Sequence, residues 1–170
     1  MKLFIVFVVA IILGSCNTIL NRVEDKKSVE LDLAKNTIIV TNSEELIAAL
    51  SDPKPGDSIF VSAGTYKLNE RFYINDSGTT DQKIFLIGDI SGERPILDFS
   101  SMKEDSSNQG MVLKADNWVI KGFQFYKAGD NGLHIRGNNN HIEFCSFSEC
   151  SDTGLQLDDG ASNNTILNCD

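Results

Sequence analysis

The last third of the chain repeats itself with a period of 22 residues, and this periodicity limits its possible folds more than any other feature. A segment that starts at Asn117 recurs at Asn139, and a further copy starts at Asn163 after a two-residue insertion. Other equivalent pairs are Ile120 and Ile142, Phe125 and Phe147, Gly132 and Gly154, and Leu133 and Leu155. A fixed period in this range is typical of solenoids, whose single repeats cannot bury their own apolar face. The recurring asparagines are expected to hydrogen-bond to one another along the stack.

Within each repeat, apolar and polar residues alternate over 133–136 and again over 155–158. In a strand this alternation points apolar side chains to one face and polar side chains to the other. The polar residues predicted to point outward are His134, Arg136, Gln156 and Asp158. Because stacked turns place like residues on like, the pattern predicts an all-β protein built as a parallel β-helix.

The front of this domain, which we place at residues 36–170, differs from the repeats. A short strand is expected at 37–41, followed by a helix that Asn42 or Ser43 caps and that carries Leu46, Ile47 and Leu50 at helical spacing. Short β runs with turn residues between them follow this helix. One helix ahead of many short strands suits a cap over the first turn of a solenoid, since an open end exposes core and strand edges.

The amino terminus has the features of an export signal. Lys2 precedes an apolar run from Leu3 to Leu13, which is too short to span a bilayer but typical of a signal peptide. Leu13-Gly14-Ser15-Cys16 resembles a bacterial lipobox, in which the cysteine carries a lipid. An ordinary secretory signal with a chance cysteine is the alternative. We therefore predict a lipoprotein signal peptide at 1–15 and lipidation of Cys16.

Residues 16–35 are polar, and we interpret them as a tether between the lipid and the domain. Together with Cys16, this interpretation predicts an exported protein that the lipid anchors at the bacterial cell envelope or surface.

The chain is acidic. Its net charge is −9, and removal of the signal peptide with Lys2 would make it −10. This charge excludes nucleic acid as an expected partner, because phosphate binding needs a basic footprint. A polyanionic ligand is also unfavourable unless a cation mediates. Three cysteines remain beyond Cys16, an odd number that favours free thiols, although a bridge between Cys145 and Cys169 on adjacent turns is sterically possible.

Several segments resemble the pectate-lyase-like right-handed β-helix proteins, and more narrowly the family 9 polysaccharide lyases. These segments are Gly56-Asp57-Ser58-Ile59-Phe60-Val61, Ala63-Gly64-Thr65-Tyr66, Pro95-Ile96-Leu97-Asp98-Phe99-Ser100, Asn117-Trp118-Val119-Ile120-Lys121-Gly122-Phe123, and the run from Gly154 to Asp170. The resemblance spans about residues 37–170 and implies a right-handed helix. It also implies a calcium-dependent lyase that cleaves polygalacturonate by β-elimination, with a lysine as base.

The resemblance also implies a metal ligand. Asn168-Cys169-Asp170 resembles the segment that opens the family's calcium site, and Asp170 stands at an outward position of the repeat, four residues after Ile166. A solvated surface carboxylate is the alternative interpretation. The other ligands and the catalytic lysine are expected downstream of residue 170, so no catalytic residue is assigned and the chain as given is expected to be incomplete and inactive.

Four other outward residues are weaker candidates. His134 and Arg136 lie beside Gln156 and Asp158 and are candidates to bind a sugar carboxylate, although exposed polar residues on a strand need no such role. The sequence as a whole therefore predicts the amino-terminal part of an exported, calcium-dependent pectate lyase, monomeric at full length. A non-catalytic β-helix that binds polysaccharide or acts as a surface scaffold is one alternative. An enzyme for another acidic glycan, such as alginate, is the other.

Overall fold

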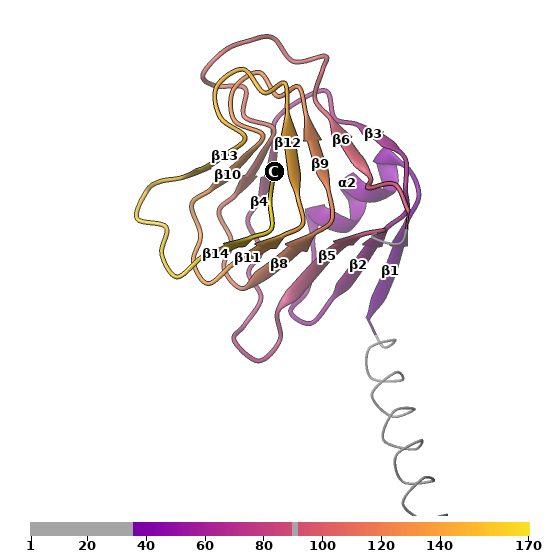
Figure 1. Cartoon of the computed structure of the whole chain (residues 1–170). Coiled ribbons are helices and arrows are strands. Elements are labelled where there is room, and N and C mark those ends of the chain that lie inside the picture. The colour runs from indigo at the N-terminus through magenta and orange to yellow at the C-terminus, as the bar shows by residue number, and fades with distance from the viewer. Residues whose placement is uncertain (1–35, 90–91) are drawn as a thin grey trace, which may run out of the picture. The chain divides into compact units, whose positions relative to one another are not determined.

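A computed structural model of the chain describes residues 36–89 and 92–170. The predicted signal peptide, the polar tether and Cys16 lie outside the described residues. Residues 37–170 form one compact unit, a solenoid of short parallel strands with one helix (Figure 1). This confirms the predicted parallel β-helix.

The strands form three sheets, and every strand pair is parallel. The six-strand sheet contains, in spatial order, β1 (Thr37–Val40), β2 (Ser58–Val61), β5 (Ile84–Gly88), β8 (Trp118–Lys121), β11 (His141–Glu143) and β14 (Thr165–Leu167). The sheet that we call β4–β13 contains β4 (Phe72–Ile74), β7 (Met111–Leu113), β10 (Leu133–Ile135) and β13 (Leu155–Leu157). The sheet that we call β3–β12 contains β3 (Thr65–Lys67), β6 (Ile96–Asp98), β9 (Gln124–Tyr126) and β12 (Ser146–Ser148).

The strand register reproduces the sequence repeat. Ile142 lies opposite Ile120 on one side and Ile166 on the other. Phe125 lies opposite Phe147, and the two rings stack with their centroids 5.0 Å apart. Equivalent positions of successive repeats therefore form columns, as the 22-residue period predicts.

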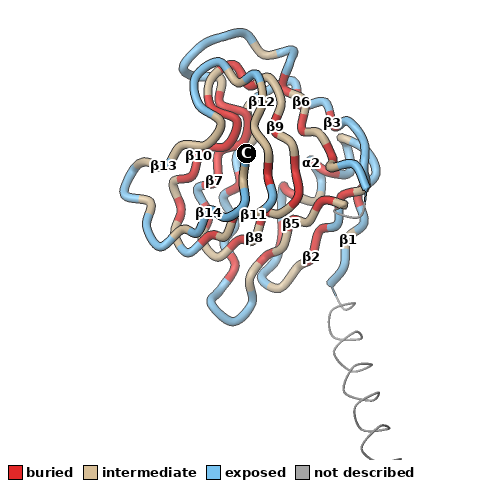
Figure 2. Tube along the Cα trace, viewed as in Figure 1, coloured by how far each residue is buried: buried red, intermediate tan, exposed pale blue. Residues whose placement is uncertain are grey.

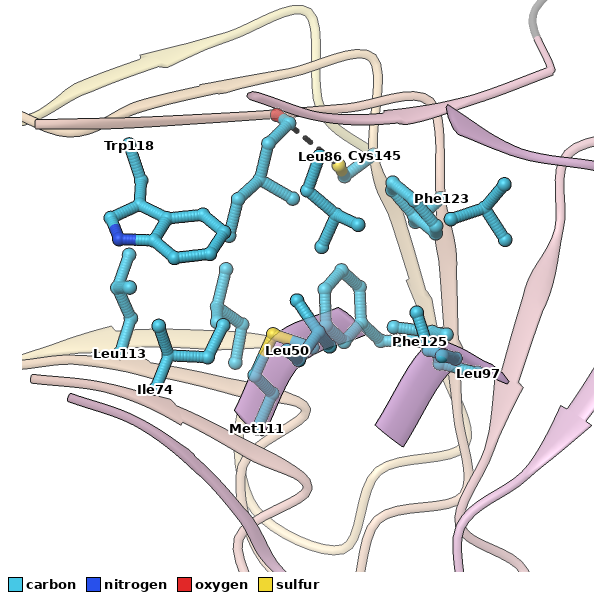
Figure 3. Close-up of a cluster of buried hydrophobic side chains, with 14 of the residues drawn as sticks. Leu50, Ile74, Leu86, Leu97, Met111, Leu113, Trp118, Phe123, Phe125 and Cys145 are labelled. Carbon is cyan, nitrogen blue, oxygen red and sulfur yellow. Dashed lines mark hydrogen bonds between the residues drawn. The ribbon is translucent and has the colours of Figure 1, made fainter. Parts of the chain in front are cut away.

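These columns place apolar side chains in the interior between the three sheets. Figure 2 colours the buried residues red along the trace. Trp118, Phe123 and Phe125 are fully buried and come from the same turn (Figure 3). The Trp118 indole nitrogen donates to the Asp76 carbonyl oxygen at 2.8 Å, so its one polar atom is satisfied. Each turn thus contributes large side chains that the turns beside it cover.

Helix α2 (Ser43–Ser51) packs against β1 and β3 and caps this end of the solenoid (Figure 1). Asn42 is its N-cap, and the side-chain oxygen accepts from the Glu45 backbone N–H at 2.9 Å. Leu46 and Leu50 are buried, whereas Ile47, which the spacing also assigned to the apolar face, is 41% exposed. No helix in the described part of the chain has the length and apolar character to cross a membrane.

Two columns of asparagines shape the bend ahead of the six-strand sheet. Asn117, Asn139 and Asn163 have positive φ values of 61°, 58° and 56°, a conformation that asparagine tolerates better than most residues. The inter-turn hydrogen bonds come from the next column. The Asn140 side-chain oxygen accepts from the Trp118 backbone N–H, and its amide nitrogen donates to the Ala115 carbonyl. Among the described residues the first column forms no amide-to-amide bonds, and the Asn117 amide nitrogen donates to the Gly78 carbonyl oxygen at 3.2 Å instead.

The described cysteines are free thiols, as the sequence predicts. Cys145 is fully buried in the core, and this burial raises the pKa of its thiol to about 11. At neutral pH the thiol is therefore protonated and acts as a small apolar core residue.

Candidate functional site

The outward face of the β3–β12 sheet carries a column of polar side chains that leads to Asp170. Gln124 lies opposite Ser146 in the register, and Asp170 continues the column. Its backbone N–H donates to the Cys145 carbonyl at 3.0 Å, and its carbonyl accepts from the Phe147 N–H at 2.8 Å. Its side chain is 74% exposed. The structure therefore places Asp170 outward, where the repeat positions predict it.

Asp170 lies at a surface hollow of about 440 Å³ on this face. The hollow is also lined by Glu93, Arg94, Gln124, Ser146 and Ser148. Arg94 Nη1 is 3.2 Å from Asp170 Oδ1, and the Gln124 amide nitrogen donates to the Ser148 hydroxyl at 2.8 Å. The Arg94 side chain is 37% exposed, so both charges of this ion pair remain accessible from solvent.

The donors and acceptors of the hollow match the chemistry of an acidic sugar. A guanidinium binds a carboxylate in a bidentate manner, and amide, hydroxyl and carboxylate groups bind sugar hydroxyls. The sequence identified Asp170 but not Glu93, Arg94 or Gln124. Gln124 stands at the position of Asp170 two repeats earlier, so the period contained the signal that finds it. Arg94 precedes the repeats, and no periodic signal points to it.

A calcium ion needs six to eight oxygen ligands, mostly from carboxylates and carbonyls. Across residues 36–89 and 92–170, no three His, Cys, Asp or Glu side chains gather closely enough to hold a metal ion. The residues around Asp170 therefore do not form a calcium site by themselves, and the positive charge of Arg94 occupies one side of the carboxylate. The role of Asp170 as a calcium ligand stays a prediction.

The other four predicted site residues lie on a different face, the outward side of the β4–β13 sheet. His134 lies opposite Gln156 in the register. His134 Nε2 is 2.7 Å from Asp158 Oδ2, and Arg136 Nε is 3.3 Å from Asp158 Oδ1. Arg136 Nε also lies 3.1 Å from Asp159 Oδ2. The contacts are short, but His134 Nε2 and Arg136 Nε lack hydrogen-bond geometry to these oxygens.

His134 points outward as predicted but is only 3% exposed. This differs from the solvent-exposed side chain that alternation suggests, because the Asp158 carboxylate lies against the imidazole. The register also places Val112 and Gln156 on either side of His134, so its neighbours leave little of the imidazole open to a sugar. The structure brings His134, Arg136 and Asp158 together as a polar cluster. Their binding of substrate stays a prediction, as does that of Gln156.

Comparison with known proteins supports the resemblance to pectate-lyase-like β-helix proteins. The description "Pel9A-like, right handed beta helix region" matches residues 29–170. Pectate lyase L from Paenibacillus polymyxa (strain SC2) is 36% identical over 134 residues, and pectate lyase L from Thermoclostridium stercorarium is 33% identical over 142 residues. These alignments cover 72% and 76% of this chain but only 30% and 11% of the relatives. The chain thus spans a third or less of the length of these curated relatives.

Two solved structures share the fold. Pectate lyase Pel9A superposes with a TM-score of 0.73 and 26% identity, covering 79% of this chain and 39% of Pel9A. An alginate lyase from Paenibacillus sp. str. FPU-7 gives a TM-score of 0.71 and 26% identity, covering 80% of this chain and 44% of the lyase. The strand register, the capped solenoid and the sequence match agree, and the chain belongs to the Pel9A-like family of right-handed β-helix proteins.

Proposed function

We propose that this chain is part of a lyase that cleaves an acidic polysaccharide by β-elimination, with polygalacturonate as the first candidate substrate. The observation that carries the proposal is the match to the Pel9A-like family over residues 29–170. Two relatives above 30% identity are named pectate lyases, which supports polygalacturonate. The hollow at Asp170 adds a chemical reason, because its cation and polar groups suit a uronate.

In this reaction a base removes the proton at C5 of a uronate. The electrons form a double bond between C4 and C5, and the C4–O bond breaks so that the neighbouring sugar leaves with its oxygen. The reaction requires neutralisation of the sugar carboxylate, since the negative charge at C5 spreads onto it. We propose that Arg94 pairs with a sugar carboxylate in the hollow and that Gln124 and Ser146 bind hydroxyl groups.

We also propose that the whole protein uses calcium and that Asp170 is one ligand. A bound calcium ion would supply further neutralisation of the uronate carboxylate, and it would reconcile the acidic chain with an anionic polymer. The remaining ligands and the catalytic base would come from outside the described residues.

Alginate is the second candidate substrate, and a specific observation favours testing it. The alginate lyase fits the chain almost as well as Pel9A does, at the same identity. The two glycans are both uronate polymers, so the carboxylate-binding chemistry of the hollow does not separate them.

The direct test measures the ultraviolet absorbance of unsaturated products. The whole protein is incubated with polygalacturonate or alginate, with calcium or with a chelator. We expect absorbance to rise with one of the two glycans when calcium is present and to stay flat with chelator. No product from either glycan in the presence of calcium would refute the lyase proposal, and full activity in chelator would refute calcium dependence.

Export and lipid attachment form a separate proposal that rests on the amino-terminal sequence. We propose that Cys16 carries a lipid that anchors the protein at the cell envelope. In cells fed a labelled fatty acid, the wild-type protein should incorporate label and sediment with membranes. Cys16→Ser should lose both properties, whereas the neighbouring Ser15→Ala should keep them. Equal labelling of Cys16→Ser and the wild type would exclude Cys16 as the lipid site.

A further inference from the structure

Three side chains on the outward face of the β4–β13 sheet form a basic and aromatic patch, which we call the Tyr73 patch: Arg71, Tyr73 and Lys114. Tyr73 lies on β4 and is 36% exposed. The Arg71 guanidinium carbon is 4.8 Å from the centroid of the Tyr73 ring, and Lys114 Nζ is 4.4 Å from it. The electron-rich ring thus holds two positive charges close together that would otherwise repel.

The Arg71 guanidinium is also oriented by a buried partner. Arg71 Nη1 donates to the Gln109 side-chain oxygen at 2.7 Å. Gln109 is 9% exposed, and its amide nitrogen donates to Asp130 Oδ2 at 3.0 Å and to the Ser106 carbonyl at 2.6 Å. This chain of bonds fixes the amide orientation and uses one nitrogen of Arg71. The other N–H groups of the guanidinium remain available to a ligand.

The two cations of the patch differ from other ring-contacting cations in lacking a carboxylate partner among the described residues. Lys121 contacts Phe144 but also pairs with Glu143, and Lys127 contacts Tyr126 but also pairs with Glu149. In the described part of the chain, neither Arg71 nor Lys114 forms an ion pair with a carboxylate. On a protein of net charge −9, two adjacent cations without a carboxylate partner form a local site for an anion.

We propose that the Tyr73 patch binds carboxylates of an acidic polysaccharide, as a surface site separate from the hollow at Asp170. The choice of a uronate polymer as ligand rests on the proposed function. Arg71 and Lys114 would pair with sugar carboxylates, and the Tyr73 hydroxyl, which has no partner in the described part of the chain, would bind a further oxygen.

The patch is remote from the hollow. It lies on β4 and the end of β7, whereas Asp170 follows β12 on another sheet. The patch therefore lies on the outward face of the β4–β13 sheet, whereas the hollow lies on the outward face of the β3–β12 sheet. A polymer held at both places would have a raised effective concentration at the hollow, which is the advantage of two linked sites.

The test measures binding of the whole protein to polygalacturonate in the presence of a chelator, so that calcium cannot mediate. The double variant Arg71→Gln/Lys114→Gln should bind at least tenfold more weakly than the wild type. The matched control is Lys83→Gln/Lys103→Gln, which removes the same charge from lysines elsewhere on the solenoid. Neither lysine forms an ion pair with a described residue, and this control should bind as the wild type does. Lys114→Arg should retain binding, and unchanged melting temperatures show that the variants are folded.

Three results would overturn the inference. One is equal binding by the wild type and Arg71→Gln/Lys114→Gln, including the case in which neither binds. Another is an equal loss in the control, which indicates only non-specific attraction. The last is a double variant that binds phosphatidylglycerol vesicles more weakly than the wild type but binds polygalacturonate equally well. This result would assign the patch to a membrane. Cleavage of a short oligogalacturonide should be the same for the double variant and the wild type. If the wild type binds polygalacturonate through the patch but cleaves neither glycan, the proposed function is refuted and the inference about the patch stands.

Discussion

Asp158 and Asp170 occupy outward positions on neighbouring sheets of the same solenoid, yet their surroundings differ. The side chain of Asp158 is 34% exposed and lies within 3.3 Å of both His134 and Arg136. The side chain of Asp170 is 74% exposed and, among the described residues, pairs only with Arg94. The repeat sets the direction of both carboxylates, but the neighbours decide whether a carboxylate binds within the protein or remains open to a ligand.

The two ion pairs also differ in origin. Arg136 and Asp158 come from consecutive repeats, so their contact follows from the stacking of turns. Arg94 precedes the repeats by sequence and reaches Asp170 from the segment ahead of β6. The cluster at Asp158 is therefore part of the internal contacts of the solenoid, whereas the pair at Asp170 lines a hollow. This difference predicts a role in stability for Asp158 and a role in function for Asp170.

The largest expected effect follows from Asp170→Asn in the whole protein. We expect activity on the glycan that it cleaves to fall about 100-fold, as for loss of a metal ligand or its close support. The free energy of unfolding should change by less than about 0.5 kcal/mol, because the side chain is exposed. Product absorbance and chemical denaturation measure the two quantities. Normal activity with a large loss of stability would reverse the assignment of roles.

A medium effect is expected from Asp158→Ala. This change removes the carboxylate that lies against the buried His134 and pairs with Arg136, which should lower the free energy of unfolding by about 1 kcal/mol. The matched control is Asp159→Ala, since Asp159 is 63% exposed and its one ion pair among the described residues is with Arg136. Chemical denaturation should show a clear loss for the first variant and almost none for the second. Equal losses would mean that the buried imidazole does not depend on Asp158.

Much of the fold could be predicted from the sequence, because residues that stack on one another in a β-helix recur at a fixed spacing. The repeat predicted which residues share a column, and the alternation predicted that Leu133 and Ile135 point inward and His134 outward. A helix cap at Asn42 or Ser43 was predicted from local residue types and spacing, and the structure has Asn42 as the cap. These features depend on neighbours close in sequence or one period away.

The candidate site could be predicted only in part, because its contacts do not follow the period. Asp170 was found through the repeat and the family resemblance, but Arg94 lies 76 residues earlier and meets it only in the folded chain. The burial of His134 was missed because alternation gives the direction of a side chain and not what covers it. The Tyr73 patch was missed for a similar reason, since Arg71 and Lys114 meet over one ring from different turns.

The smallest expected effect separates the two ion pairs by their coupling energies. In a double-mutant cycle of stability, Arg94→Gln with Asp170→Asn should give a coupling below about 0.5 kcal/mol, since exposed ion pairs contribute little and are screened by salt. Arg136→Gln with Asp158→Asn should give about 1 kcal/mol, because Asp158 is half-buried against a histidine that keeps water away. Chemical denaturation at low and high salt measures both cycles. A larger coupling for Arg94 than for Arg136 would mean that the pair at the hollow supports the fold, and it would remove the physical basis for treating Asp170 as open to a ligand.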